Sequence, residues 1–227
     1  MPNAPKIELE LSGIRFLWAH FITPIYPNGR DGKPDTTKPM RYEGTVMIPK
    51  AHPVVHVLRA KLREALAAHY GADKVPDNFG MFNLPITDGD KRADDRKAAV
   101  VRGEPKAAEC EYTRGYWLLN VRTGAKYELP LATVINGKAE NLISSNRAAH
   151  ANDFYWGVDG GCMVSFTAYD PTPLAPHGGC SCWINDAYSN MTGDKIGGSG
   201  RDPAARMSGY AGKSSDVDPT ARSASGF

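Results

Sequence analysis

The sequence has little net charge for its length. Its 27 Lys and Arg residues nearly balance 25 Asp and Glu, so the formal net charge of the 227 residues is only +2. Charge over the whole chain therefore does not point to a nucleic-acid partner, and any basic surface must come from local clustering. An apolar run long enough to span a membrane is also missing, and residues 1–6 lack the pattern of a signal peptide. We therefore expect a protein of the cytoplasm with no membrane contact.

Motifs for catalysis or metal binding are missing as well. The sequence has no Walker loop, no Gly-x-Ser-x-Gly and no His-Glu-x-x-His, and its six histidines do not pair with carboxylates at useful spacing. The four cysteines form no Cys-x-x-Cys pair, and the acidic run at residues 88–95 lacks the spacing of a calcium loop. We expect no cofactor and no metal, and we expect small buried thiols at Cys110, Cys162, Cys180 and Cys182.

Alternating apolar and polar residues are frequent. This pattern predicts strands at residues 7–21, 41–48, 116–123, 131–135, 162–169 and 180–188. The last two flank a loop rich in Pro and Gly, which is typical of a long-looped hairpin, and Asn136-Gly137 predicts a tight turn after the fourth. One helix is clear at residues 53–70, with Pro53 in its first turn, Gly71 after its end and an apolar stripe between them.

These elements predict a mainly β fold with one helix. About five strands and a single helix fit a small Greek-key barrel such as the OB-fold, with a β-sandwich as the alternative. Residues 72–114 look loop-rich, and residues 199–227 have few large apolar side chains. We therefore expect one domain at residues 1–198 and a flexible C-terminal tail at residues 199–227.

Four stretches carry a likeness to a known family. They are residues 14–24, Tyr42-Glu-Gly-Thr-Val-Met-Ile-Pro-Lys50, Leu84-Pro-Ile-Thr-Asp-Gly-Asp90, and residues 154–198 beginning Phe154-Tyr155-x-Gly157. In this order the sequence resembles the phage single-stranded DNA-binding proteins of the Enc34 type, a family previously defined only as a domain of unknown function. The resemblance implies an OB-fold, sequence-tolerant binding of single strands and a role in phage replication or recombination. Two features depart from the family pattern: the tail is not acidic, and Trp156 and Trp183 stand where smaller residues are expected.

Basic and aromatic residues alternate around several predicted strands. Single-strand binding needs positive charge to follow the phosphates and flat rings to stack on the bases. The candidate site residues are Arg41, Tyr42, Lys50, Arg114, Tyr116, Trp117, Arg122, Tyr155, Trp156 and Trp183. Among the rings, Tyr42 and Tyr116 are the favoured stacking platforms. The alternative is that the rings belong to the core and the charges are merely solvated.

The resulting prediction is a non-enzymatic protein whose partner is single-stranded DNA. It would act in the cytoplasm of a bacterial host, and its tail, which ends in Phe227, could recruit phage replication proteins. Three alternatives remain open: a strand-annealing or recombination-mediator protein, a phage structural accessory protein with a β core, and a nuclease that uses a metal at residues 88–95. The sequence indicates no oligomeric state.

Overall fold

The first strand shows how the alternating pattern becomes a folded surface. The computed structural model describes residues 6–29, 32–104 and 108–196. In β1 (Ile7–Ile25), the apolar side chains of Ile7, Leu9 and Leu11 are buried while the residues between them are exposed. Successive side chains of a strand point to opposite faces, so one face of β1 packs and the other meets solvent. The described residues fall within the predicted domain, and the predicted tail lies outside them.

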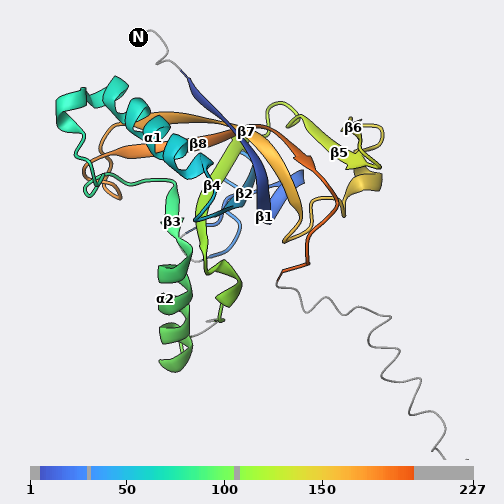
Figure 1. The fold of residues 1–227 in the computed structure, drawn as a ribbon, viewed down its shortest axis with the longest axis horizontal. Helices are drawn as coiled ribbons and strands as arrows, with labels where there is room; N and C mark the ends of the chain where they lie inside the picture. Colours follow the sequence, from blue (N-terminus) through green and yellow to red (C-terminus); the bar gives the residue numbers. More distant parts are fainter. Residues whose placement is uncertain (1–5, 30–31, 105–107, 197–227) are drawn as a thin grey trace, which may run out of the picture. The chain divides into compact units, whose positions relative to one another are not determined.

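Five strands close into a barrel (Figure 1). They are β1, β2 (Arg41–Pro49), β4 (Tyr116–Gly124), β7 (Asp159–Tyr169) and β8 (Gly179–Ser189). β1 pairs with β2 and β7, β2 pairs with β4, and β7 pairs with β8, all antiparallel. A parallel pairing of β4 with β8, at Arg122 and Trp183, closes the ring. This order is that of an OB-fold-like barrel, so the predicted fold class is confirmed.

Three further strands extend this sheet. β3 (Ile86–Asp88) pairs with β4, and β5 (Leu131–Ile135) runs parallel to β8 and forms a hairpin with β6 (Lys138–Leu142). The predicted Asn-Gly turn joins β5 to β6, with φ of 52° at Asn136 and 74° at Gly137. Positive φ at both central residues is what a two-residue hairpin turn requires, and it explains why Asn and Gly stand there.

The helices confirm one expectation and correct another. α1 (Val54–Tyr70) follows Pro53 and buries Leu58, Leu62, Ala65 and Leu66 against the barrel. The expectation of a single helix was wrong, because α2 (Gly89–Val101) forms in the stretch that looked loop-rich. Short 3-10 turns occur at η1 (Ala72–Lys74), η2 (Glu111–Thr113) and η3 (Arg147–His150). Among the described residues, no helix is long and apolar enough to cross a membrane.

α2 was not predicted from the sequence because it has no apolar stripe at helical spacing. Its buried residues are only Gly89, Ala93 and Ala99, so the spacing of large apolar side chains gave no signal. The helix starts instead from a local cap, in which the Asp88 carboxylate accepts from the backbone N–H of Asp90 at 2.9 Å. A side chain at Gly89 would meet the carbonyl oxygen of Thr113 at 2.1 Å, so only glycine fits between strand and helix.

Aromatic rings and thiols fill the barrel interior. The ring of Phe21 meets those of Phe16 and Phe154 edge to face, with centroids 5.2 and 5.8 Å apart. Cys180 and Cys182 are buried, as expected, and burial raises the pKa of the Cys180 thiol to about 12. These thiols are therefore protonated at neutral pH, which leaves them as small apolar side chains.

Candidate functional site

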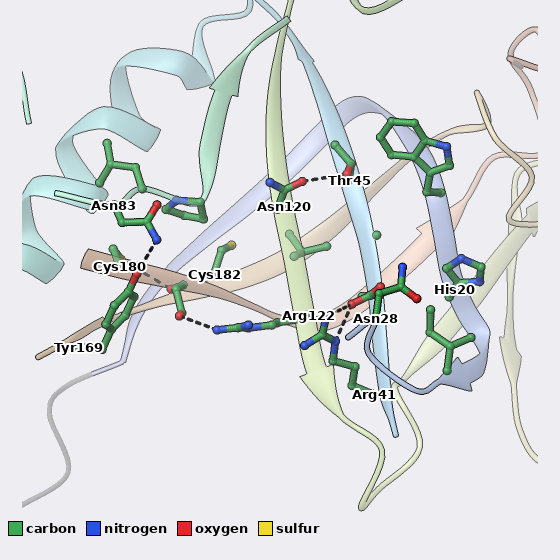
Figure 2. A pocket seen from close by; sticks show the side chains of 18 of the residues that line it. His20, Asn28, Arg41, Thr45, Asn83, Asn120, Arg122, Tyr169, Cys180 and Cys182 are labelled. Atoms are coloured by element: carbon green, nitrogen blue, oxygen red, sulfur yellow. Dashed lines mark hydrogen bonds and ion pairs between the residues drawn. The ribbon is translucent and has the colours of Figure 1, made fainter. Parts of the chain in front are cut away.

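An open groove of about 710 Å³ crosses the outer face of the barrel. Its floor is made by β2 and β4, where Thr45 donates a hydrogen bond from Oγ1 to the Asn120 Oδ1 at 3.0 Å. His20 of β1 borders one end, while Tyr169 and Asn83 border the other (Figure 2). In an OB-fold this face, on the second and third barrel strands, is the one that binds oligonucleotides.

Strand geometry decides which side chains reach the groove. On β2, Arg41, Glu43 and Thr45 line it, whereas Tyr42 and Val46, at the alternate positions, belong to the hydrophobic core. The pairing of β2 with β4 sets Glu43 opposite Arg122 and Thr45 opposite Asn120. Two strands with a polar outer face and an apolar inner face therefore build both the groove and the core.

Two arginines give the groove its positive charge. Arg41 and Arg122 lie near each other in its middle (Figure 2). Arg41 donates to the Glu43 carboxylate at 2.5 Å, so part of its charge is already balanced. Arg122 is exposed, and its Nη2 donates to the neutral hydroxyl of Ser181 at 3.0 Å. The charge of Arg122 is therefore the more available to an anionic ligand.

Flat aromatic rings line the same groove or flank its arginines. Trp156, with 37% of its surface exposed, lines it and meets Trp18 edge-on, with centroids 6.1 Å apart. Trp183 is equally exposed, and the Arg122 guanidinium carbon lies 5.6 Å from the centroid of its ring. The hydroxyl of Tyr169 accepts from Asn83 Nδ2 at 2.8 Å, which holds this ring at the groove's end. Rings exposed beside arginines can stack on bases while the arginines hold phosphates.

Three predicted ring residues lie away from the groove. Tyr42 is only 4% exposed, so the expectation that it stacks on a base was wrong. The physical reason is its place on the inner face of β2, where its ring lies under the guanidinium of Arg147. Tyr116, the other favoured platform, packs against the small buried cluster of Leu17, Met47 and Leu118, and Trp117 packs against the main core.

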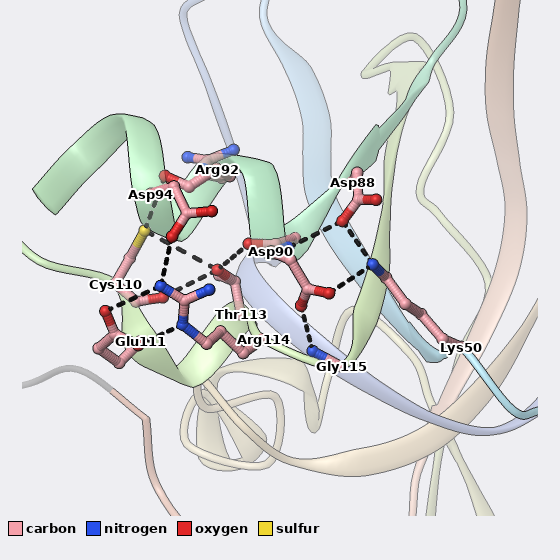
Figure 3. A network of polar contacts seen from close by, with 11 residues as sticks. Lys50, Asp88, Asp90, Arg92, Asp94, Cys110, Glu111, Thr113, Arg114 and Gly115 are labelled. Carbon is pink, nitrogen blue, oxygen red and sulfur yellow. Dashed lines mark hydrogen bonds and ion pairs between the residues drawn. The ribbon is translucent and has the colours of Figure 1, made fainter. Parts of the chain in front are cut away.

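Lys50 and Arg114 serve a polar network around α2 (Figure 3). Lys50 donates to Asp88 at 2.6 Å and to Asp90 at 2.7 Å, and these hydrogen bonds raise its pKa. Arg114 donates to Glu111 at 2.5 Å and to Asp94 at 2.6 Å, and hydrogen bonds to these carboxylates raise its pKa too. Neither side chain lines the groove, so both fit better as supports of α2 than as phosphate ligands.

Tyr155 does not line the groove either, and its contacts are with residues 193–195. Its hydroxyl donates to the carbonyl of Gly193 at 2.8 Å, and Lys195 Nζ lies 5.4 Å from its ring centroid. The groove therefore gathers Arg41, Arg122 and Trp156 from the ten predicted site residues, with Trp183 beside Arg122.

Trp18, His20 and Tyr169 line the groove, and the sequence did not single them out. Strict alternation along β1 puts Trp18 and His20 on the same face as Phe16, which is fully buried. The register of β1 against β2 shifts between Leu17 and His20, and Trp18 has a φ of 51°. This bulge turns the two side chains outward, and sequence periodicity cannot reveal such a turn.

Several solved structures with a similar fold are phage proteins. The single-stranded DNA-binding protein of bacteriophage Enc34, in complex with ssDNA, aligns with a TM-score of 0.61 at 17% identity, covering 84% of this chain and 89% of that one. The single-stranded DNA-binding protein gp2.5 of bacteriophage T7 aligns with a TM-score of 0.51 at 13% identity, covering 97% and 100%. No protein-family model and no curated protein matches the sequence. The resemblance inferred from sequence motifs is thus confirmed at the level of fold: this chain shares the barrel of phage single-stranded DNA-binding proteins such as that of Enc34.

Proposed function

We propose that the protein binds single-stranded DNA in the groove across β2 and β4. The observation that carries this proposal is the meeting of two arginines, Arg41 and Arg122, with the exposed rings of Trp156 and Trp183 on one open face. A groove with positive charge along its middle and flat rings at its sides has the two features that single strands need.

Phosphates and bases would bind to different parts of this surface. Arg122 and Arg41 neutralise backbone phosphates, and each neutralised phosphate releases counterions, so binding weakens as salt rises. Bases stack on the tryptophans and on Tyr169, at about 1–3 kcal/mol for each stacked base. Every base has a flat face, so this mode of binding tolerates most sequences.

The biological role follows the same proposal. The neighbours in fold are phage proteins named for single-stranded DNA binding, which supports a non-enzymatic role in phage replication or recombination. In this role the protein would act in the cytoplasm of the bacterial host, protecting single strands and removing hairpins. Strand annealing would use the same groove to bring two strands together.

Titration of intrinsic tryptophan fluorescence with oligothymidylate tests the proposal. Trp18 and Trp156 line the groove and Trp183 flanks Arg122, whereas Trp117 lies beneath Lys50. Binding should quench the fluorescence, and the quench should persist in Trp117→Phe but shrink in the double variant Trp156→Phe with Trp183→Phe. If the quench were lost in Trp117→Phe alone, the ligand would lie near Trp117 and outside the groove, which would contradict the proposal.

A second assay separates the alternative functions. The protein is incubated with Mg²⁺ and labelled single strands, and the products are resolved on native and denaturing gels. Retarded, intact DNA supports the proposal, and faster duplex formation from complementary strands would add annealing to it. Cleaved DNA, or no retardation at low salt, would contradict it.

A further inference from the structure

A second hollow, of about 120 Å³, lies behind Trp18. It is lined by Arg92 and Arg96 of α2 and by Cys110 and Tyr112 of the segment that follows α2. Trp18 borders both this hollow and the main groove, so one ring separates the two. The bulge that turns Trp18 outward, with its φ of 51°, is a conformation that bulky residues adopt at a cost, and such residues cluster at binding sites.

The two arginines share one face of α2. Residues four apart are neighbours on a helix surface, so Arg92 and Arg96 point the same way. The guanidinium carbon of Arg92 lies 4.6 Å from the centroid of the Trp18 ring. A guanidinium that stacks on a ring keeps its N–H groups free at its edge, and this planar edge matches a phosphate.

Two carboxylates of α2, Asp90 and Asp94, are engaged elsewhere, whereas Asp95, next to Arg96, forms no ion pair within the described residues. Asp90 accepts from Lys50 and from the backbone N–H of Gly115, both at 2.7 Å, and Asp94 accepts from Arg114 at 2.6 Å (Figure 3). Within the described part of the chain, neither Arg92 nor Arg96 forms an ion pair with a carboxylate, although Glu109 borders the hollow. In the part of the chain that the structure describes, the guanidinium groups of Arg92 and Arg96 therefore remain unpaired beside an aromatic ring, where a phosphate can reach them.

Building on the proposed function, we propose that the path of single-stranded DNA continues past Trp18 to a phosphate subsite formed by Arg92 and Arg96. A strand that leaves the groove at Trp18 passes directly onto this hollow, because both hollows share that ring. Arg92, fixed by its stack on Trp18, and Arg96 then neutralise the next phosphates of the backbone. α2, which the sequence alone did not reveal, thereby lengthens the binding site beyond the barrel.

The test compares the wild type with the double variant Arg92→Gln and Arg96→Gln. Glutamine keeps much of the side-chain length over Trp18 but removes both charges. Affinity is measured for oligothymidylates of about 4 to 16 nucleotides, the range of site sizes for single OB-folds, at several salt concentrations. Arg102→Gln is the matched control, because Arg102 caps the same helix, pairs with Glu104 at 2.8 Å and lines neither hollow.

The affinity of the wild type should keep rising as the oligomers become longer than the one that just fills the groove. The affinity of the double variant should not rise beyond that length. For the longer oligomers, the slope of log affinity against log salt should fall by about 0.7 for each phosphate that the variant no longer neutralises. Unchanged length dependence and slope, or an equal weakening in Arg102→Gln, would overturn the subsite while leaving the groove proposal standing. A wild type that binds no oligomer would instead overturn the groove proposal itself. Circular dichroism confirms that the variants keep their helices.

Discussion

The guanidinium carbon of Arg122 lies 5.6 Å from the centroid of the Trp183 ring, where β4 and β8 pair to close the barrel. The same guanidinium donates to Ser181 at 3.0 Å, so two neighbours on β8 hold it at the groove without neutralising it. A preorganised arginine beside an exposed ring loses less conformational entropy when it binds a phosphate.

Replacing Arg122 with glutamine should weaken single-strand binding while leaving the fold intact. Hydrogen bonds to charged groups contribute about 1.5–3 kcal/mol, so the affinity should fall about tenfold or more. The slope of log affinity against log salt should fall by about 0.7. Lys61→Gln is the control, because Lys61 pairs with Glu64 on α1, away from the groove. An Arg122 variant with the salt slope of the wild type would exclude Arg122 as a phosphate ligand.

Replacing Glu43 with glutamine should strengthen binding. The Glu43 carboxylate lines the groove and occupies Arg41 at 2.5 Å, so DNA must displace it and approach a like charge. A partly exposed pair is worth about 0.5–1 kcal/mol, which corresponds to an affinity gain of about two- to fivefold. The measurement is a titration at low salt, with Glu64→Gln as the control on α1. Weaker binding by the Glu43 variant would mean that this carboxylate positions Arg41 for DNA rather than competing with it.

Tyr42 should matter for stability rather than for stacking. Its ring is 4% exposed and lies 5.6 Å from the Arg147 guanidinium carbon, inside the barrel. Tyr42→Ala should therefore lower the free energy of unfolding by about 3–5 kcal/mol, as for other buried aromatics. Tyr42→Phe keeps the packing and should leave DNA affinity unchanged. Urea denaturation and DNA titration of both variants check this, and a Phe variant that folds but binds poorly would contradict it.

Strand periodicity predicted the barrel because burial on one face leaves a clear signal. All five barrel strands and α1 were found in this way, and the Asn136-Gly137 turn was found from its dipeptide. α2 was not predicted, because it is built by the Asp88 cap and small buried residues and has no apolar stripe. Within the site, Arg41 and Arg122 could be found from their charge at strand positions. Tyr42 could not be placed, since alternation gives two faces but does not say which one is the core.

The acid stability of the α2 junction should depend on Lys50. Burial alone would raise the pKa of Asp88, but the hydrogen bonds from Lys50 and from the Asp90 backbone lower it below its ordinary value. The hydrogen bond from Lys50 likewise lowers the pKa of Asp90. Carboxylates with depressed pKa values stabilise the fold above the unfolded pKa of about 3.9, and this contribution is lost as pH falls through the folded pKa.

Lys50→Gln should therefore lower Tm near neutral pH, and the gap from the wild type should close as pH falls below about 4 and Asp88 and Asp90 are protonated. At alkaline pH the lysine itself titrates. Hydrogen bonds from Lys50 to both carboxylates raise its pKa, so its contribution to stability is fully present below the unfolded pKa of about 10.4 and is lost as pH rises through the folded pKa. Thermal melts of both proteins from pH 2 to 8 test the acid arm, with Lys61→Gln as an exposed-pair control that should change Tm little at any pH. The difference in Tm between the wild type and Lys50→Gln could instead stay constant down to pH 2. That result would show that the lysine acts by packing over Trp117, where its Nζ lies 5.2 Å from the ring centroid, and not through its ion pairs.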